Sequence, residues 1–178
     1  MPNLLELFAG LLEYPRPGLG DLARECERSA AGSEAALGLA EFRRFVERTP
    51  PAQLEEVYTA AFDLGADRSP YVGYHLFGDG YTRRAFLREL RARFRERGLD
   101  TGSELPDHLS CLLRLASAYG PGQQREEIVR EAILPALQRM TAATAGGTAE
   151  AGEGGEPAAQ PDAYMGLLKA LAAVLSGG

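Results

Sequence analysis

Residues 49–63 read TPPAQLEEVYTAAFD, and this stretch carries the clearest secondary-structure signal in the chain. Its larger apolar residues recur every three or four positions, at Leu54, Val57, Tyr58, Ala61 and Phe62. Apolar residues at this spacing lie on one face of an α-helix. Thr49 is expected to cap the helix, and the two prolines suit its first turn because no backbone donor is needed there. The stretch therefore predicts an amphipathic helix with one buried face.

The same helical periodicity extends over most of the chain, and no run of alternating β-branched residues predicts a strand. Further helices are expected at residues 4–12, 19–31, 33–48, 81–97, 106–119, 124–140 and 164–175. Pro135 removes a backbone donor from one of them and is expected to bend it. Together these segments predict an all-α fold, a single-domain helical bundle of about seven or eight helices.

The composition changes after the main helical region. Residues 142–162, AATAGGTAEAGEGGEPAAQPD, contain no large apolar side chain. Such a segment buries too little apolar surface to order itself, so it predicts a disordered linker. We therefore expect a helical domain at residues 1–141, a linker at 142–162 and a C-terminal helix at 163–178. That last helix either folds back onto the bundle or remains tethered.

Charge and cysteine content narrow the possible functions. The formal net charge of −6 disfavours nucleic acid as a partner and favours a basic peptide or protein segment. Cys26 and Cys111 are expected to be reduced core thiols, because two cysteines make no disulfide framework for 178 residues. No secretion signal and no apolar run of about 20 residues is recognisable, so a cytoplasmic protein without membrane insertion is expected.

One segment is strongly basic, although the chain as a whole has a negative net charge. Residues 83–97, RRAFLRELRARFRER, contain seven arginines and two glutamates. Their apolar residues fall at helical spacing and leave the arginines outside. We expect a solvated helix face here, with a polar docking patch as the alternative.

The motif GYHLFGDGYTRR at residues 73–84 sets aromatic, acidic and histidine side chains around three glycines. Its glycine spacing is not that of a phosphate-binding loop, and no nucleophile motif accompanies it. His75 and His108, the only two histidines, lack the neighbours that a metal site needs. Asp79 suits a helix cap and Asp107 a first helical turn. The residues therefore predict neither an enzyme nor a metal site.

Three motifs give the sequence a resemblance to a known family. Residues 58–63, 74–79 and 104–109 read YTAAFD, YHLFGD and ELPDHL. In this order they resemble the NarJ family, the nitrate reductase molybdenum-cofactor assembly chaperones also called delta subunits. That family belongs with the TorD- and DmsD-like redox-enzyme maturation proteins. The resemblance covers about residues 4–140.

The resemblance implies a cytoplasmic helical chaperone that is not an enzyme and binds no cofactor itself. Its implied partner is the molybdenum-containing catalytic subunit of a respiratory nitrate reductase, bound through the N-terminal leader of that subunit. The implied role is to assist molybdenum-cofactor insertion before membrane docking. A leader that folds as a basic amphipathic helix would suit an apolar groove edged with carboxylates.

The residues expected to bind the peptide are Asp63, Tyr71, Tyr74, His75, Phe77, Asp79, Asp107 and His108. Asp107 and His108 match an Asp-His pair implicated in leader binding in DmsD-like proteins. For Tyr74 and Phe77, ordinary core packing is the alternative. The sequence leaves the client enzyme open. A helical adaptor for another peptide remains an alternative function, as does a small metal-dependent enzyme that uses His75 and His108.

Overall fold

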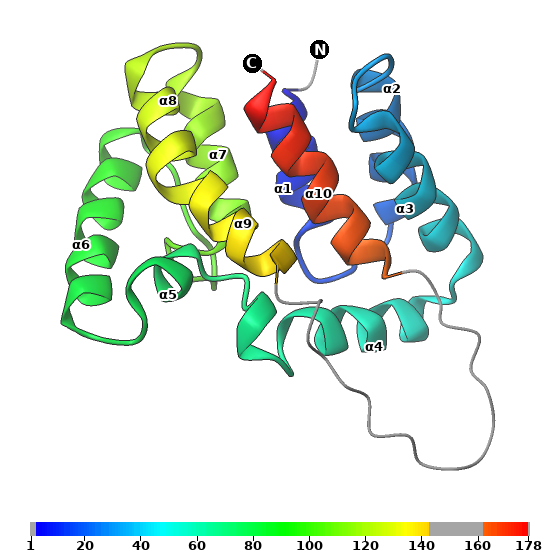
Figure 1. Ribbon diagram of the computed structural model, residues 1–178, viewed down its shortest axis with the longest axis horizontal. Helices are drawn as coiled ribbons and strands as arrows, with labels where there is room; N and C mark the ends of the chain where they lie inside the picture. The colour runs from blue at the N-terminus through cyan, green and yellow to red at the C-terminus, as the bar shows by residue number, and fades with distance from the viewer. Residues whose placement is uncertain (1–2, 143–161, 178) are drawn as a thin grey trace.

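The computed structural model describes residues 3–142 and 162–177, which form an all-α fold (Figure 1). The α-helices are α1 (Leu4–Leu11), α2 (Leu19–Ser29), α3 (Ala36–Arg48), α4 (Pro51–Phe62), α5 (Val72–Phe77), α6 (Tyr81–Glu96), α7 (Leu109–Tyr119), α8 (Gln123–Ile128), α9 (Leu134–Ala142) and α10 (Ala163–Ser176). A 3₁₀ turn at Ala66–Arg68 precedes α5, and a π-helical segment at Val129–Ile133 joins α8 to α9. The predicted helical bundle is therefore confirmed, with the short α5 as an element that the sequence did not delimit.

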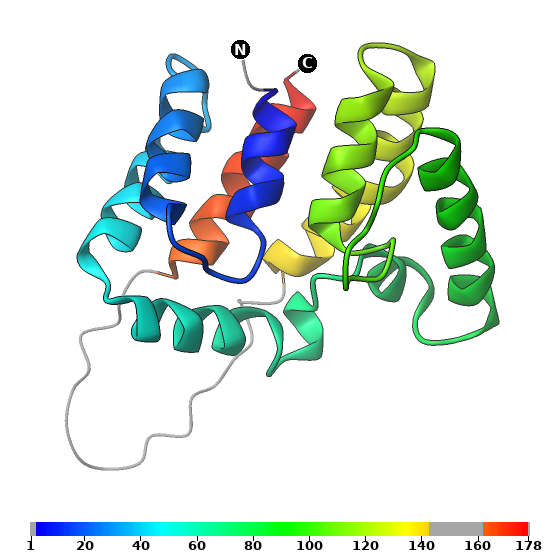
Figure 2. The same cartoon turned by 180° about the vertical axis from the view of Figure 1, so that it is seen from behind.

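Helices α1 and α10 occupy the centre of the bundle, with α10 in front of α1 in Figure 1 and behind it in Figure 2. Helices α2 and α3 flank this pair on one side, and α7, α8 and α9 flank it on the other. Helix α4 runs across the base, while α5 and α6 extend outward beyond α9. Over the described ranges, every helix is too short or too polar to cross a lipid bilayer.

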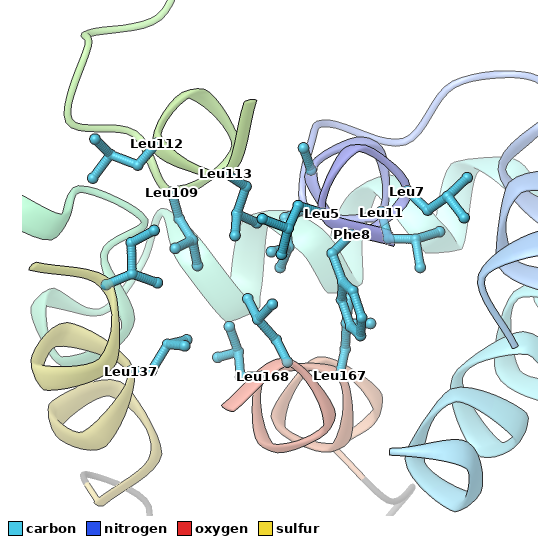
Figure 3. Close-up of a cluster of buried hydrophobic side chains, with 14 of the residues drawn as sticks. Leu5, Leu7, Phe8, Leu11, Leu109, Leu112, Leu113, Leu137, Leu167 and Leu168 are labelled. Carbon is cyan, nitrogen blue, oxygen red and sulfur yellow. The ribbon is translucent and has the colours of Figure 1, made fainter. Parts of the chain in front are cut away.

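Apolar faces of the two central helices build the core. Figure 3 shows Phe8 of α1 pointing toward Leu167 of α10, with Leu113 of α7 and Leu137 of α9 closing the other side. All four side chains are fully buried. Burial of such a side chain contributes roughly 1.5–3 kcal/mol, so both central helices are major sources of stability.

The C-terminal segment folds back and packs against α3 and α9. It approaches α3 so closely that a Cβ added at Gly38 would lie 3.0 Å from the carbonyl oxygen of Gly166. Asp162 caps α10 by accepting a hydrogen bond from the Met165 N–H at 3.1 Å. The rest of the predicted linker at residues 142–162 falls outside the described residues after α9 ends, so its disorder and the domain boundaries stay predictions.

Four aromatic rings from α3, α4 and α10 meet in one buried cluster. Tyr164 of α10 lies 5.3 Å from Phe42, 5.7 Å from Tyr58 and 5.0 Å from Phe62, measured between ring centres. These rings pack edge to face, the arrangement that their quadrupoles favour. The Tyr58 hydroxyl donates to the carbonyl oxygen of Leu12 at 3.2 Å. The buried Tyr164 hydroxyl has no hydrogen-bond partner among the described residues.

Pro135 changes the hydrogen-bond pattern of its helix. Proline lacks the N–H that would bond to the carbonyl of Glu131, and its ring crowds that carbonyl. The preceding turn widens into the π-helical segment, in which the Leu134 N–H bonds to the carbonyl of Val129, five residues back. A π-helical turn is a known way to accommodate such a disturbance. The disturbance predicted at this proline therefore takes the form of a π-helical segment.

Three predicted roles of polar residues at helix starts are wrong. Thr49 ends α3, where its hydroxyl donates to the carbonyl of Phe45 at 2.6 Å, and α4 begins without a side-chain cap. A glycine, and not Asp79, holds the cap position of α6. Asp107 lies outside α7, whose N-cap is His108. In each case the polar side chain bonds elsewhere, because short polar residues near helix ends have several partners within reach.

Replacing Tyr164 by Phe should stabilise the protein by about 1 kcal/mol, because the substitution removes a buried hydroxyl that lacks a partner. The matched change Tyr58→Phe in the same cluster should destabilise by about 1 kcal/mol, because it removes a made hydrogen bond. Urea unfolding of the two variants measures both effects. Equal signs for the two variants would contradict this assignment of the hydroxyls.

Candidate peptide-binding site

Two of the sequence motifs meet through their backbones. The Val72 N–H donates to the carbonyl oxygen of Asp107, and the Leu109 N–H donates to that of Pro70, both at 2.8 Å. These bonds form an isolated antiparallel bridge between Tyr71 and residue 108. The start of α5 is thereby fixed against the start of α7, although the two lie far apart in sequence.

Asp107 forms a buried ion pair beside this bridge. Its side chain has no exposed surface, and its Oδ2 accepts a hydrogen bond from Arg83 Nε of α6 at 2.9 Å. The pair also needs Gly73, because a Cβ there would lie 2.7 Å from the same Oδ2 and 3.0 Å from the Phe86 ring. The carboxylate therefore joins α5, α6 and the start of α7.

His108 is almost fully buried and acts as the N-cap of α7. Its Nδ1 accepts a hydrogen bond from the Ser110 N–H at 3.2 Å and lies 2.8 Å from the Ser110 hydroxyl. Burial lowers the pKa of His108, while Glu104, Glu13 and Asp107 oppose this and Arg114 adds to it. The cap requires an unprotonated Nδ1, so the neutral ring is the form that fits the structure.

Tyr71 stands between the buried pair and the surface. Its hydroxyl donates to Glu104 Oε2 at 3.0 Å, and its ring packs edge to face on the His108 ring at 5.4 Å. The guanidinium carbon of Arg83 lies 5.5 Å from the ring centre. Burial, together with the hydrogen bond and the charge of Glu104, raises the pKa of Tyr71 to about 12.

A hollow of about 270 Å³ opens beside Tyr71, between the end of α4 and the start of α5. Of the predicted residues, Asp63, Tyr71 and Tyr74 line it. Leu64, also on its wall, leaves 78% of its surface exposed. The hollow therefore combines a free carboxylate, two phenol rings and an exposed aliphatic side chain.

The acidic character continues from the hollow along α4 to the end of α1. Tyr14 donates to Glu55 at 3.0 Å and packs on Tyr58, and the pKa of Tyr14 is raised by this bond, by burial and by the charges of Glu55 and Asp63. Burial raises the pKa of both Tyr58 and Tyr71, and the charges of Asp63 and Glu104 raise the pKa of both phenols further. We define the acidic face as Tyr14, Glu55, Asp63, Leu64, Tyr71, Tyr74, Glu104 and Leu105.

Three predicted residues lie away from this face. His75 Nε2 is 2.7 Å from the carbonyl oxygen of Ser69, and burial lowers the pKa of the ring. Phe77 is 43% exposed and packs against Phe86 of α6. Asp79 is exposed and reaches Arg83 only at 3.4 Å. These residues occupy the other side and the far end of α5.

The described residues contain no group of three His, Cys, Asp or Glu side chains that could hold a metal ion. Each histidine ring instead contacts a serine close to it in sequence: His75 lies against the carbonyl oxygen of Ser69, and His108 against Ser110. Cys26 and Cys111 are free and buried, as predicted. Burial raises the thiol pKa of Cys26 to about 12 and that of Cys111 to about 11, so both thiols are protonated at neutral pH.

The sequence pattern of the nitrate reductase delta subunit family matches residues 29–145, about two thirds of the chain. The chain belongs to this family. Membership of this family gives the chain a chaperone role in nitrate reductase assembly, which agrees with the resemblance of its motifs. Among proteins of curated function, no sequence gives a match.

The delta-subunit match runs from the end of α2 to just beyond α9 and includes every predicted site residue. Helices α1 and α10 lie outside it, yet they supply the centre of the core. In this delta-subunit protein, the matched region therefore holds every residue of the acidic face except Tyr14, while the helices on either side of it in sequence complete the packing.

Sequence reasoning missed several residues of this site. Glu104 is part of the ELPDHL motif, and its position three residues before the buried aspartate could have marked it. Leu64 is an apolar residue directly after a helix end, which is a weak signal of exposure. Arg83 and Gly73 act through contacts across α5, α6 and the start of α7 that no local pattern contains.

Asp107→Asn should destabilise the protein by about 3 kcal/mol, because it leaves the partly buried Arg83 without its buried counter-charge. Asp79→Asn is the matched control: it removes the exposed carboxylate of the same arginine and should cost less than about 1 kcal/mol. Urea unfolding distinguishes the two. A loss for Asp107→Asn no larger than for Asp79→Asn would show that the buried pair does not support the fold.

Stability should fall as the pH drops below about 6.5, because burial lowers the folded-state pKa of His75 and His108 while the unfolded chain still binds their protons. His108→Asn keeps a side-chain acceptor at the α7 cap but cannot titrate in this range. The urea midpoints of both proteins at pH 7.5 and pH 5.5 test this. The variant should lose less stability than the parent, and an identical loss would count against a neutral His108 cap.

Proposed function

We propose that this chain binds the N-terminal leader of the molybdenum-containing catalytic subunit of a nitrate reductase, and that it does so on the acidic face. In the cytoplasm, the bound chaperone would keep the subunit ready for molybdenum-cofactor insertion and delay membrane docking until insertion is complete. Binding of a peptide, and not catalysis, is the proposed activity. The observation that carries the proposal is the combination of exposed apolar side chains and unneutralised carboxylates on one face.

The chemistry of the acidic face suits a basic amphipathic helix. Tyr14, Leu64 and Leu105 are 47%, 78% and 38% exposed and offer apolar contacts. Glu55 and Asp63 are exposed beside them and form no ion pair within the described residues. A leader that folds on binding would place its apolar side against these exposed apolar side chains and its basic side chains against the two carboxylates.

Other hollows of the molecule suit a basic peptide less well. The groove of about 780 Å³ between α8 and the end of α10 is lined by Arg125 and Arg130 beside a single glutamate. The hollow of about 500 Å³ between α3 and α10 is lined by Arg44 and Arg48 and also by Glu41 and Asp162, so its charges balance. Neither rim therefore has the excess of carboxylates that would attract the basic side chains of a leader. Size alone therefore does not identify the peptide site.

The predicted site residues divide by exposure into contacts and supports. Asp63, Tyr71 and Tyr74 border the hollow and are proposed as peptide contacts. Asp107 and His108 are buried, so we propose that they act by holding the α5 and α7 starts together. Because Tyr71 belongs to this backbone bridge, the bridge fixes the position of its phenol ring.

The remaining predicted residues support or extend the same site. His75 contacts the backbone at the turn before α5 and is proposed to hold that turn. Phe77 and Asp79 are exposed at the far end of α5, about 9 Å along a helix of six residues. A peptide that follows α5 from the hollow reaches both.

The combined variant Asp63→Asn, Leu64→Ser, Glu104→Gln should bind the leader at least about tenfold more weakly than the parent, a loss of about 1.4 kcal/mol or more. The matched control is Glu34→Gln, Leu37→Ser, Glu131→Gln, because Leu37 is also 78% exposed and these residues lie elsewhere on the surface. Calorimetric titration with a synthetic leader of the catalytic subunit measures the affinities. The control should bind like the parent.

Each failure of this experiment has a separate meaning. A folded parent protein that does not bind the leader would overturn the proposed function and favour a helical adaptor for another peptide. Leader binding that is equally strong in the site variant would keep the function and overturn the site. Equal weakening in both variants would show that total charge, and not the acidic face, determines affinity.

A further inference from the structure

The outer face of α6 carries a row of arginines that the leader site does not use. Helix α6 forms the outer edge of the molecule in both views, and no other described element covers its outer side (Figures 1 and 2). The exposed residues of this row are Tyr81, Arg84, Arg88, Arg91 and Arg95. We call them the arginine row.

The spacing of the row places all its members on one line. Successive members are alternately three and four residues apart, which keeps them on one side of a helix. The four arginines span about 17 Å along the axis, at 1.5 Å for each residue. Leu90 and Phe94, which anchor α6 in the core, lie on the opposite side.

The other arginines of α6, and Arg97 at its C-cap, all have partners. Arg83 pairs with Asp107, and Arg93 pairs with Glu89 and Glu127. Arg97 donates to Gln124 at 2.7 Å and lies over the Tyr119 ring. By contrast, no member of the arginine row forms an ion pair within residues 3–142 and 162–177.

The fold of α6 does not need the arginine row. The helix is held by its buried residues and by a Schellman motif, in which the Leu99 N–H bonds to Phe94 and the Gly98 N–H bonds to Arg95. Gly98 has a φ of +64°, the left-handed conformation that this motif requires. Like charges three and four residues apart repel one another and weaken a helix. The row therefore opposes the stability of the free protein.

We propose that the arginine row is a second docking surface and that it binds an acidic α-helical segment of a partner protein. Carboxylates spaced three and four residues apart on such a helix would match the row in direction and spacing. Arginine pairs with carboxylates through two parallel hydrogen bonds, which favours this partner. Tyr81 is 71% exposed at one end of the row, with Phe77 nearby in the chain, and aromatic and arginine side chains are typical of protein interfaces.

An acidic helix fits the row better than a membrane or a nucleic acid. The net charge of −6 repels extended polyanions, whereas a short acidic helix meets only the local positive row. The apolar side of α6 is directed to the core, so it offers a bilayer little to insert. The row has the opposite charge to the acidic face, so its partner differs in chemistry from a basic leader. This inference therefore goes beyond the proposed function.

The experiment uses the full chain and two synthetic helical peptides of identical composition. One peptide carries four glutamates at alternating three- and four-residue spacing, and the other spreads them around the helix. Fluorescence anisotropy at low salt and at about 0.15 M salt measures their affinities. The parent should bind the first peptide at least tenfold more tightly than the second, and more weakly at higher salt.

Matched variants locate the binding. Replacing Arg84, Arg88, Arg91 and Arg95 by Gln should weaken binding of the first peptide at least tenfold. Replacing the exposed Arg16, Arg28, Arg48 and Arg130 by Gln removes the same charge elsewhere and should leave it within about twofold. Circular dichroism confirms that both variants are folded. Leader binding should be unchanged in the row variant, so this test is independent of the proposed function.

Several results would overturn the proposal. Equal loss in the two arginine variants would reduce the effect to net charge. Equal affinity for the two peptides would show that the spacing of the row has no role. Binding to phosphatidylglycerol vesicles or to duplex DNA that is tighter than peptide binding, and that is lost in the row variant, would assign the row to that surface instead.

Discussion

The buried carboxylate of Asp107 is the constraint on which the site depends. It pairs with Arg83 of α6 and belongs to the short segment whose backbone bonds to the start of α5. Desolvation makes an isolated buried charge costly, so the carboxylate and the guanidinium must be placed together. The glycine at position 73 is the steric counterpart of the same pair, because a side chain there would displace the carboxylate. One ion pair thereby positions α5, α6 and α7 with respect to one another.

This arrangement separates two surfaces of opposite charge. The bridge between the α5 and α7 starts leaves Tyr71 and Glu104 at the edge of the acidic face. On α6, the same packing turns Arg83 inward and the arginine row outward. A net charge of −6 hides this polarity, because the sum gives no information about where each sign is exposed. A short segment that docks on one face therefore meets the local charge of that face as well as the net charge of the protein.

The sequence predicted what depends on local periodicity and missed what depends on contacts between distant segments. The helix at residues 49–63 was recognisable because five apolar residues share one face, and the structure has α4 there. The caps expected at Thr49 and Asp79 were wrong because neighbouring residues could take those positions and the side chains bonded elsewhere. The partnership of Asp107 with Arg83 spans 24 residues, so no helical pattern contains it. The site motifs were therefore recognised as motifs, but the role of each residue followed only from burial.

Burial also changes what a substitution in these motifs can show. Asp107 and His108 have almost no exposed surface, so loss of binding after their replacement would report a displaced scaffold as readily as a lost contact. Asp63 and Leu64 are exposed, so their replacement acts on the surface and leaves the core intact. Helices α1 and α10 also act only through packing. They lie outside the family match and hold the matched region in place, but they do not form the surface of the hollow. Contacts with a partner are therefore to be sought among the exposed residues, whereas the buried motif residues hold those exposed residues in position.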